Sequence, residues 1–450
     1  MEAPSLRPLA RELGGRHESL PPSRWGGPWE RDWVLSPPLP EVEPALRKKR
    51  AKGSRMTDNI EMSTLSKDVH ALVPDLVALR RDLHEHPELS YQETRTAERV
   101  ASFLRGSNLS LRTGLGGTGI VAETGNTGRT VLLRVDMDGL PIHESSEAPY
   151  VSRNPGVMHA CGHDGHTAIG AAVARLLPKR DLKGRIRVLF QPAEEGEGGA
   201  QAMVAEGVMD GVDVALGIHL WNELPVGTIG VKAGPLMAAV DRLKIVVHGR
   251  GGHGGKPHRS ADPVVAAAYV VAALQSVVSR EVSPLQSAVV TIGAIHGGQA
   301  FNVIPDEVTL TGTIRTFDEE LRRSMPERIR RLASGIAEGL QCRAEVAVTH
   351  GNPAVVNHPS VADIARRAAA KVVGEGNVVV PEPTMGGEDM AIYFERAPGC
   401  FVFVGSANAA RGLDQPHHSP RFDFDEGALA IGCEFLLQAA QEALTSPLPT

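Results

Sequence analysis

The sequence of 450 residues has few cysteines, no long basic runs and no long apolar run. The four cysteines, Cys161, Cys342, Cys400 and Cys433, show no paired spacing, which argues against a disulfide framework and favours a reducing cytoplasm. The net charge of −6 and the absence of long basic runs argue against nucleic acid as the main partner. No apolar run approaches the ~20 residues that span a bilayer, so no membrane segment is expected.

The composition that remains is that of a globular protein of more than one domain, with 42% hydrophobic and 22% charged residues. Residues 1–55 differ from the rest, because they are rich in proline, glycine and charge and have no periodicity. They lack the apolar core of a signal peptide, and their acidic residues argue against a transit peptide. We predict a disordered N-terminal extension there. Three of the four tryptophans fall in it, which leaves a tryptophan-based docking motif as the alternative.

From Lys67 to about Trp221, helical patterns alternate with short apolar runs, which are "GIVAE", "TVLLRVD", "RIRVLF" and "VALGIHL". Such runs are typical of strands buried on both faces, and the alternation predicts a mixed, largely parallel α/β sheet. Residues 56–237 are therefore expected to form the first part of a larger domain. Ligands of such folds bind at the carboxyl ends of the strands.

The pattern changes over residues 238–350. "RLKIVVHG" predicts a strand, and "DPVVAAAYVVAALQSVV" a helix with Asp262 at the N-cap and Pro263 at the first position. The strands "SAVVTIGAI" and "VTLTGTIRT", a helix from about Asp318 to Leu340 and the strand "AEVAVTH" follow. This βαββαβ order predicts an inserted ferredoxin-like module. Residues 351–450 then supply the second part of the larger domain, in which "CFVFVG" is expected to rejoin the first sheet.

Polar residues gather where the strands of the larger domain end. "VLLRVDMDG" ends in Asp136 and Asp138, "VLFQPAEEGEGGA" carries Glu194 and Glu195, and "VALGIHLW" carries His219. The helix lead-in "MHACGHDGHTA" and the late loop "QPHHSPRFDFDE" add a cysteine and further histidines. Each such residue alone could be a helix cap or a satisfied core group. Together, a thiol, imidazoles and carboxylates at one sheet edge would suit a two-metal site with open positions for water and substrate.

At this point the sequence resembles the metal-dependent amidohydrolases that include aminoacylases, hippurate hydrolase, indole-acetyl-amino-acid hydrolases and, more distantly, carboxypeptidase G. The resemblance runs from about Lys67 to Leu444 and rests on "LHEHPELSYQE", "RVDMDGLPIHE", "MHACGHDGHTA", "FQPAEEGEGGA", "GIHLW", "GGHGGKPH", "FNVIPD", "GTIRTFD" and "HHSPRFDFDE". The cysteine form, CGHD, looks like the hippurate hydrolase branch. The resemblance implies a catalytic domain over 56–237 and 351–450, with 238–350 as a lid and dimerisation domain.

The resemblance also implies roles for individual residues. The expected metal ligands are Cys161, His163, Glu195, His219 and His418. His417 is the alternative to His418, which the spacing to "FDFDE" favours. Glu194 is expected to be the general base and His253 to act on the oxyanion. Asn302 is also expected to act from the inserted module, and Arg315 to bind the substrate carboxylate. Asp136 and Asp138 are expected to orient the ligands, and His159, Asp164 and His166 to orient ligands or to cap the helix.

The function expected from this resemblance is hydrolysis of the amide bond of N-acyl amino acids in the cytoplasm. It would use two divalent metal ions per subunit, zinc or manganese with cobalt or nickel as further candidates, and the protein would be a homodimer through the inserted domain. Two alternatives remain at this stage, a non-catalytic binding protein of the same fold and a protein with a single structural zinc. The sequence does not distinguish acetyl, benzoyl and indole-acetyl substrates.

Overall fold

The computed structural model describes residues 65–125, 127–196 and 198–447. The predicted disordered extension, residues 1–55, lies outside the described residues. The helices are α1 Lys67–Glu85, α2 Thr94–Phe103, α3 His163–Leu176, α4 Gly199–Ala205, α5 Pro263–Ser276, α6 Glu319–Gly339, α7 Pro359–Val373, α8 Met390–Phe394 and α9 Gly427–Thr445.

The strands belong to one large sheet, one four-stranded sheet and two short pairs. They are β1 Ser110–Leu115, β2 Gly119–Gly125, β3 Thr130–Asp136, β4 Arg185–Gln191, β5 Val214–Pro225, β6 Ile229–Gly230, β7 Gly234–Met237, β8 Ala239–His248, β9 Gly252–His253, β10 Ala288–Gly297, β11 Val303–Ile304, β12 Glu307–Thr316, β13 Arg343–His350, β14 Val355–Asn357, β15 Val378–Val379 and β16 Gly399–Ala407.

The large sheet has eight strands in the order β1-β2-β4-β3-β5-β16-β6-β15. Its centre is parallel, because β3 pairs in parallel with β4 and β5, and β5 pairs in parallel with β16. The strands β1 and β2 extend it in antiparallel fashion. The predicted mixed, largely parallel sheet is therefore confirmed, and so is the return of "CFVFVG" to it as β16.

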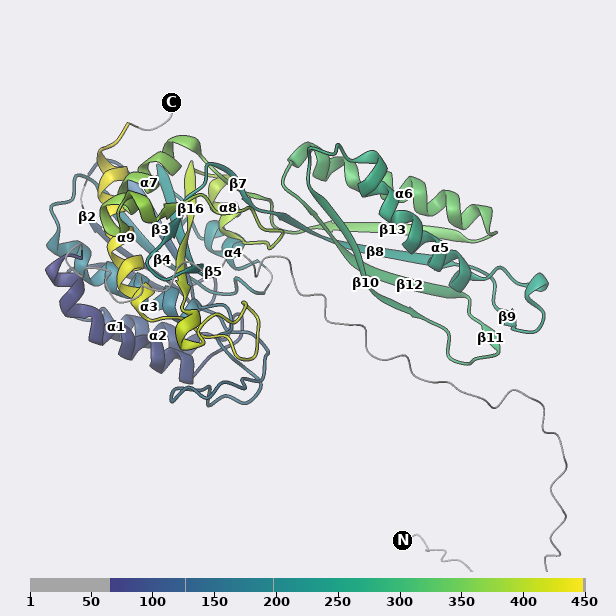
Figure 1. Ribbon diagram of the computed structural model, residues 1–450, viewed down its shortest axis with the longest axis horizontal. Coiled ribbons are helices and arrows are strands. Elements are labelled where there is room, and N and C mark those ends of the chain that lie inside the picture. Colours follow the sequence, from purple (N-terminus) through teal and green to yellow (C-terminus); the bar gives the residue numbers. More distant parts are fainter. Residues whose placement is uncertain (1–64, 126, 197, 448–450) are drawn as a thin grey trace, which may run out of the picture. The chain divides into compact units, whose positions relative to one another are not determined.

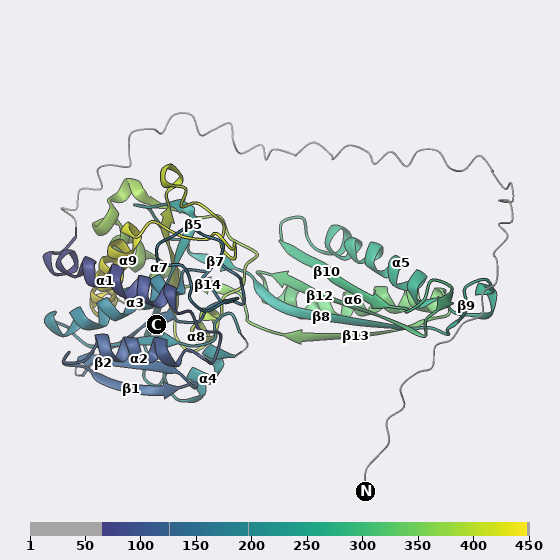
Figure 2. The same cartoon turned by 90° about the horizontal axis from the view of Figure 1, so that it is seen from below.

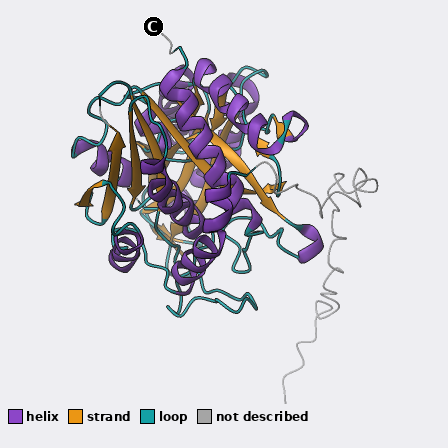
Figure 3. Ribbon diagram, turned by 90° about the vertical axis from the view of Figure 1, so that its left-hand side faces the viewer, coloured by secondary structure: helices purple, strands orange, loops and turns teal. Residues whose placement is uncertain are grey.

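The central strands are buried on both faces, as their apolar sequences predict. Every residue of β3 is buried. Val131, Leu133 and Val135 belong to a core shared with α1, α3, α7 and α9, whereas Leu132 belongs to a second core that includes residues of α4 and α8. This alternation follows from the two-residue period of a strand. The ribbon views show the resulting layers of helices over the strands (Figures 2 and 3).

The inserted domain has the predicted βαββαβ order, β8-α5-β10-β12-α6-β13. Its sheet is antiparallel with the order β10-β12-β8-β13, and α5 and α6 pack against each other and share one core with the strands. The carboxylate of Asp262 accepts hydrogen bonds from the amides of Val264 and Val265, which confirms the expected N-cap of α5. The domain lies in the chain between β7 and β14, which pair with each other.

Helix α5 and the turn after it are more apolar than the sequence analysis allowed for. The helical stretch Pro263–Glu281 is 19 residues long and contains an 18-residue window with a mean hydropathy of 1.4, enough to cross a membrane by length and composition alone, which corrects the expectation that no run approaches this length. Its inner side chains Ala266, Val270 and Leu274 are buried in the core of the inserted domain. Core helices of globular proteins commonly have this length and composition, so length and composition alone are weak evidence for a membrane segment.

Candidate active site

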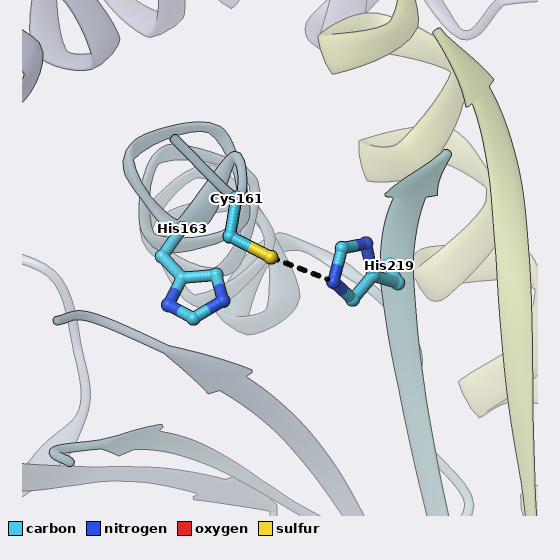
Figure 4. A group of neighbouring side chains, drawn as sticks. All are labelled: Cys161, His163 and His219. Atoms are coloured by element: carbon cyan, nitrogen blue, oxygen red, sulfur yellow. Dashed lines mark hydrogen bonds between the residues drawn. The ribbon is translucent and has the colours of Figure 1, made fainter. Parts of the chain in front are cut away.

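The site begins at the N-terminus of α3. Gly162 precedes the helix with φ of 89°, a left-handed conformation that other residues rarely adopt, and it turns the chain between Cys161 and His163. The thiol Sγ of Cys161 lies 3.5 Å from Nε2 of His219, which comes from β5 (Figure 4). The helix start and the strand thus bring a thiol and two imidazoles together, as the sequence predicted.

The hydrogen bonds of the two histidines leave the same ring nitrogen available in each. Nδ1 of His219 donates to the carbonyl oxygen of Leu220 at 2.7 Å, and Nδ1 of His163 lies 3.0 Å from the carbonyl oxygen of Asp138. Nε2 of His163 is buried without a hydrogen-bond partner. Imidazoles that ligate metals are commonly held through the opposite nitrogen in this way. Both Nε2 atoms are therefore suited to bind a metal.

The predicted ligands form overlapping groups whose donor atoms all lie within 4.8 Å of one another. One group is Cys161, His163 and His219, another is Cys161, Glu195 and His418, and a third is His163, Glu194 and Glu195. Nε2 of His418 lies 3.1 Å from Oε1 of Glu195. Because the groups share Cys161, His163 and Glu195, the five predicted ligands form one cluster.

The structure separates the roles of the two adjacent histidines. His417 stacks on Trp221 with ring centroids 4.8 Å apart, and its Nε2 donates to the carbonyl oxygen of Leu220. Burial lowers the pKa of His417 to about 4. His418 is more exposed, has a positive φ of 64°, and its backbone amide donates to the carbonyl oxygen of Ala160, next to the thiol. His417 is thus packed against Trp221 and beside His219, whereas the ring of His418 belongs to a donor group with Cys161 and Glu195.

Asp138 and Asp136 hold the cluster from behind, in the places expected of orienting carboxylates. Asp138 accepts hydrogen bonds from the backbone amides of Glu194 and Glu195, and its Oδ1 lies 3.3 Å from Nδ1 of His163. Asp136 accepts from Nδ1 of His166, whose Nε2 accepts from the amide of Leu220.

Of the two roles expected of His159, Asp164 and His166, helix capping is not found, because no side chain makes a cap hydrogen bond at the start of α3. Asp164 lies in the first turn and instead pairs with Arg80 and His84. The first turn of α3 is buried, and there the carboxylate of Asp164 neutralises the buried guanidinium of Arg80.

Glu194 lies beside a group of charged residues that the sequence analysis missed. It is one of three carboxylates, with Glu388 and Asp389, whose oxygens approach within 4.8 Å. The guanidinium of Arg134, buried in the middle of β3, pairs with both Glu388 and Asp389. Burial, Glu388 and Glu195 raise the pKa of Glu194 well above its usual value. The one feature of the sequence that indicates this charged group is Arg134, which interrupts the otherwise apolar run "TVLLRVD".

The chemistry of the cluster fits a divalent cation. Burial and the carboxylates Glu195 and Glu194 raise the pKa of the Cys161 thiol, and a dication among these groups would reverse this because coordinating thiols are deprotonated. Burial and the nearby His166 lower the pKa of His219, which keeps its imidazole neutral and able to donate electrons to a metal. Mixed sulfur, nitrogen and oxygen donors suit zinc and several first-row transition metals.

A cleft of about 670 Å³ opens over this cluster. The residues that line it include Cys161, Glu194, Glu195, His219, His418, Trp221 and Arg315. Arg315 comes from β12, and its Nε donates to Oγ1 of Thr313 at 3.0 Å. The expected carboxylate-binding arginine therefore shares a cleft with the expected ligands and base.

His253 and Asn302 do not line this cleft. They lie next to each other, because β9 pairs with β11 and the amide of Gly254 donates to the carbonyl oxygen of Asn302. Figure 1 shows β9 and β11 at one end of the inserted sheet, next to the end where Glu307 pairs with His248. Arg315 lies eight residues beyond Glu307 on β12, which places it roughly 25 Å from that end of the strand. Within one chain, these two residues are separate from the metal cluster.

Residues 132–442 match peptidase family M20/M25/M40. The chain is 44% identical over 370 residues to an N-acetylcysteine deacetylase of Bacillus subtilis, an alignment that covers 81% of this chain and 96% of the relative. It is 46% identical over 289 residues to an N-acyl-L-amino acid amidohydrolase of Geobacillus stearothermophilus, covering 63% of this chain and 78% of the relative.

A solved structure agrees with these sequence matches. The crystal structure of the Bacillus subtilis YXEP protein, described as a dinuclear metal-binding peptidase of family M20, superposes with a TM-score of 0.73 and 39% identity. The match covers 83% of this chain and 99% of that one. With a family match over most of the chain, relatives named for amide hydrolysis and a donor cluster that fits divalent cations, the protein belongs to peptidase family M20/M25/M40 and is a metal-dependent hydrolase of amide bonds.

Proposed function

We propose that the protein hydrolyses the amide bond between an acyl group and an amino acid, with two divalent metal ions per subunit. The observation that carries this proposal is the convergence of Cys161, His163, Glu195, His219 and His418 in one cluster, which opens onto a cleft beside the carboxylate of Glu194. Relatives named N-acetylcysteine deacetylase and N-acyl-L-amino acid amidohydrolase support the substrate class.

The five converging residues would hold the metals, with Cys161 common to two of the donor groups. A bound divalent metal supplies Lewis-acid activation of water and of the scissile carbonyl. Zinc or manganese suits these donors, and cobalt or nickel are further candidates. The chain's own contribution is to fix the donors through Asp138, the carbonyl oxygen of Leu220 and the turn at Gly162.

Glu194 is the proposed general base and acid. Its carboxylate lies among the donors without being required by either of the groups that contain Cys161. It would take a proton from the attacking water and deliver it to the nitrogen of the leaving amine. A raised pKa suits this double role, because the carboxyl group must both gain and lose a proton in one catalytic cycle.

Arg315 is the proposed receptor for the free carboxylate of the substrate. Its guanidinium is half-buried in the wall of the cleft and is oriented by Thr313. A guanidinium grips a carboxylate through two parallel hydrogen bonds, which selects substrates with a free carboxylate next to the scissile amide.

We further propose a homodimer through the inserted domain. The outer face of α5 exposes Val264, Val265 and Tyr269, with 47%, 43% and 61% of their surfaces accessible. Strand β10 is an edge of the four-stranded sheet, and edges of this kind are commonly paired or covered. A two-fold partner would cover both features.

His253 and Asn302 would then serve the cleft of the partner subunit. His253 is exposed, and its Nδ1 accepts a hydrogen bond from the amide of Gly255, which leaves an Nε2 proton free to donate to an oxyanion.

The two alternatives fit the site less well. A non-catalytic binding protein would not need Glu194 among the donors, and a single structural zinc would be closed by four ligands and would not open onto a large cleft. Metal analysis separates them, because the proposal requires about two ions per chain, whereas a structural site requires one. To identify the preferred acyl group, the substrate panel should include acetyl, benzoyl and indole-acetyl amino acids.

The test compares Glu194→Gln with Glu195→Gln, which remove one charge each from adjacent positions. We expect Glu194→Gln to lower kcat by roughly 100- to 10,000-fold with metal content unchanged, because it removes a proton acceptor but no ligand. Glu195→Gln should lower metal affinity at least ~10-fold. Turnover of the panel and metal content by mass spectrometry are measured for both. The assignment fails if Glu194→Gln loses metal and Glu195→Gln keeps it.

A further inference from the structure

Strand β5 runs past the end of its neighbour β3. The pairing of the two strands ends where Arg134 of β3 meets Gly217 of β5, whereas β5 continues to Pro225. On the other edge, β16 pairs with β5 through this stretch. Among the described strands, none pairs with the β3 edge of β5 beyond Gly217. Leu220 lies in this stretch and is fully buried, so its backbone N–H and C=O groups need other hydrogen-bond partners.

Two imidazoles supply these partners. Nε2 of His166 accepts a hydrogen bond from the amide of Leu220 at 2.8 Å, and Nε2 of His417 donates to the carbonyl oxygen of Leu220 at 2.9 Å. His166 comes from α3, and His417 comes from the segment between β16 and α9. The same carbonyl oxygen accepts from Nδ1 of His219 at 2.7 Å. We call the rings of His166 and His417, with the Leu220 backbone between them, the imidazole bracket.

The imidazole bracket is itself held by further contacts. Nδ1 of His166 donates to Oδ1 of Asp136 at 2.6 Å, and both of these side chains are fully buried. The ring of His417 stacks on Trp221. Neither imidazole can rotate away from Leu220 without breaking these contacts, so the carbonyl oxygen of Leu220 has a fixed position.

We propose that His417 is a positioning residue for the metal ligand His219. Under the proposed function, on which this inference rests, Nε2 of His219 binds a metal ion together with Cys161, whose Sγ lies 3.5 Å from it (Figure 4). The direction of that nitrogen is set by the hydrogen bond from Nδ1 to the Leu220 carbonyl oxygen, which His417 also binds. Hydrogen-bond partners of this kind orient ligating imidazoles and select their tautomer.

The neighbouring His418 has a separate role. His418 is itself a donor, in a group that does not contain His219. The two adjacent histidines thus serve two donor groups, His418 directly and His417 through the Leu220 carbonyl oxygen. Loss of the hydrogen bond from His417 should therefore weaken the ion held by His219 and leave the ion held by His418 nearly unchanged.

The test compares His417→Met with His417→Gln. The two new side chains are similar in length and shape, and both lack the ring that stacks on Trp221, but only glutamine can donate to the Leu220 carbonyl oxygen. Calorimetric titration of the metal-free proteins with Zn²⁺ measures the affinity for each ion. We expect His417→Met to lower the affinity for one ion by about 10- to 100-fold, and His417→Gln to stay close to the wild type. An equal loss in both variants would assign the effect to packing and overturn the inference, and so would an equal loss at both ions.

A second measurement needs no bound metal and separates this inference from the proposed function. Nitrogen NMR of the metal-free protein, labelled at its histidines, reports which ring nitrogen of His219 carries the proton. We expect one form, protonated at Nδ1, in the wild type and in His417→Gln, and a mixture of both forms in His417→Met. His417→Phe, which keeps a ring on Trp221 and loses the donor, should behave like His417→Met. A single Nδ1 form in both donorless variants overturns the inference. If no N-acyl amino acid is hydrolysed, the proposed function fails, and the NMR comparison still decides whether His417 positions His219.

Discussion

Arg80 and Arg134 are both fully buried, and each is neutralised by carboxylates from distant parts of the chain. Arg80 of α1 pairs with Asp164, 84 residues away, and with Asp423, 343 residues away. Arg134 reaches Asp389 in the same way. Burying a lone charge is costly, so these pairs hold the segments that carry the metal donors in fixed positions. No spacing in the sequence indicates such partners, because only the fold brings them together.

His84 belongs to the group around Arg80 and makes stability depend on pH. Burial and Arg80 act to lower its pKa, but Asp164 and Glu144 outweigh them and raise it to about 8. Because the folded pKa lies above the usual 6.5, the added stability is fully present below pH 6.5 and is lost as pH rises through 8. The shift corresponds to about 2 kcal/mol. We expect His84→Gln to lower the free energy of unfolding more at pH 6 than at pH 9, as measured by denaturant titration.

A histidine on the same helix provides the control for this measurement. His70 is exposed on α1, so His70→Gln should leave the pH profile of stability close to that of the wild type. An equal loss of stability at pH 6 and pH 9 in His84→Gln would mean that the imidazole contributes by packing and not by its charge.

Part of the donor set was accessible from its position, because Cys161 and His163 stand at the start of α3 and Glu195 follows the end of β4. The expectation that His219 ends its strand is wrong, since β5 continues to Pro225, and His418 lies in a loop. Cys161, His163 and His219 meet as expected. The choice between His417 and His418 depended on spacing alone until the stack of His417 on Trp221 explained why two histidines are adjacent. The stacking of His417 on Trp221 could not be predicted, because His417 lies in a loop and loops have no periodic pattern that indicates which side chains pack.

At the scale of elements, α3 packs unusually close to its neighbours at the end that carries the donors. A Cβ atom added at Gly165 would lie 2.5 Å from Cδ1 of Leu220 and 2.7 Å from Cζ of Phe424. Gly165 is itself buried, in the first turn after His163. The absence of a side chain therefore sets the distance between the helix start and β5.

We expect Gly165→Ala to be destabilising although alanine is the better helix former. Its methyl group must push α3 away from Leu220 or Phe424, which costs about 1–3 kcal/mol and moves Cys161 and His163 relative to His219. Melting temperature and metal affinity should both fall. Gly335 of α6 is the matched control, since a Cβ there meets nothing within 4 Å, and Gly335→Ala should stabilise by up to ~1 kcal/mol. Similar effects of both substitutions would contradict the close-packing argument.

The longer elements follow from sequence patterns, and the short ones do not. The runs that became β2, β3, β4, β5 and β16 were recognisable because a strand buried on both faces is continuously apolar. The strands β6 and β15 have two residues each and pair only with each other and with β16. Two residues carry no periodicity, so their pairing is decided by neighbours that are far away in the chain.

At the scale of the whole molecule, the inserted module was recognisable because the hydrophobic pattern changes after β7 and returns after β13. Its topology follows from the element order, and the structure confirms it. The distance between the functional residues on it could not be predicted. Arg315 lines the cleft, whereas His253 and Asn302 lie at the short β9–β11 pair, beyond the opposite end of the sheet that carries Arg315. The sequence gives the order of residues along a strand, but it does not show whether residues at the far end of that strand serve the cleft of their own chain or that of a partner subunit.

This separation leads to the prediction that His253 acts in the cleft of the partner subunit. His253→Ala and Glu194→Gln should each be nearly inactive alone. When the two proteins exchange subunits, half of the dimers are hybrids, and each hybrid has one cleft with both an intact Glu194 and an intact His253 from the other chain. About a quarter of the wild-type activity should therefore return at equal mixing. Turnover is measured after exchange, and native mass spectrometry confirms the hybrids.

The control is a mixture of Glu194→Gln with Glu195→Gln. Both of these residues belong to the same cleft of their own chain, so every cleft in such a hybrid carries one defect, and no activity should return whether His253 acts in cis or in trans. If the His253→Ala mixture also stays inactive although hybrids have formed, His253 acts within its own chain or not at all. Because roughly 25 Å of sheet separates His253 from Arg315, action within one chain would require a large movement of the β9 and β11 segment toward the cleft. Recovery in the first mixture and none in the second would make the dimer a condition of catalysis.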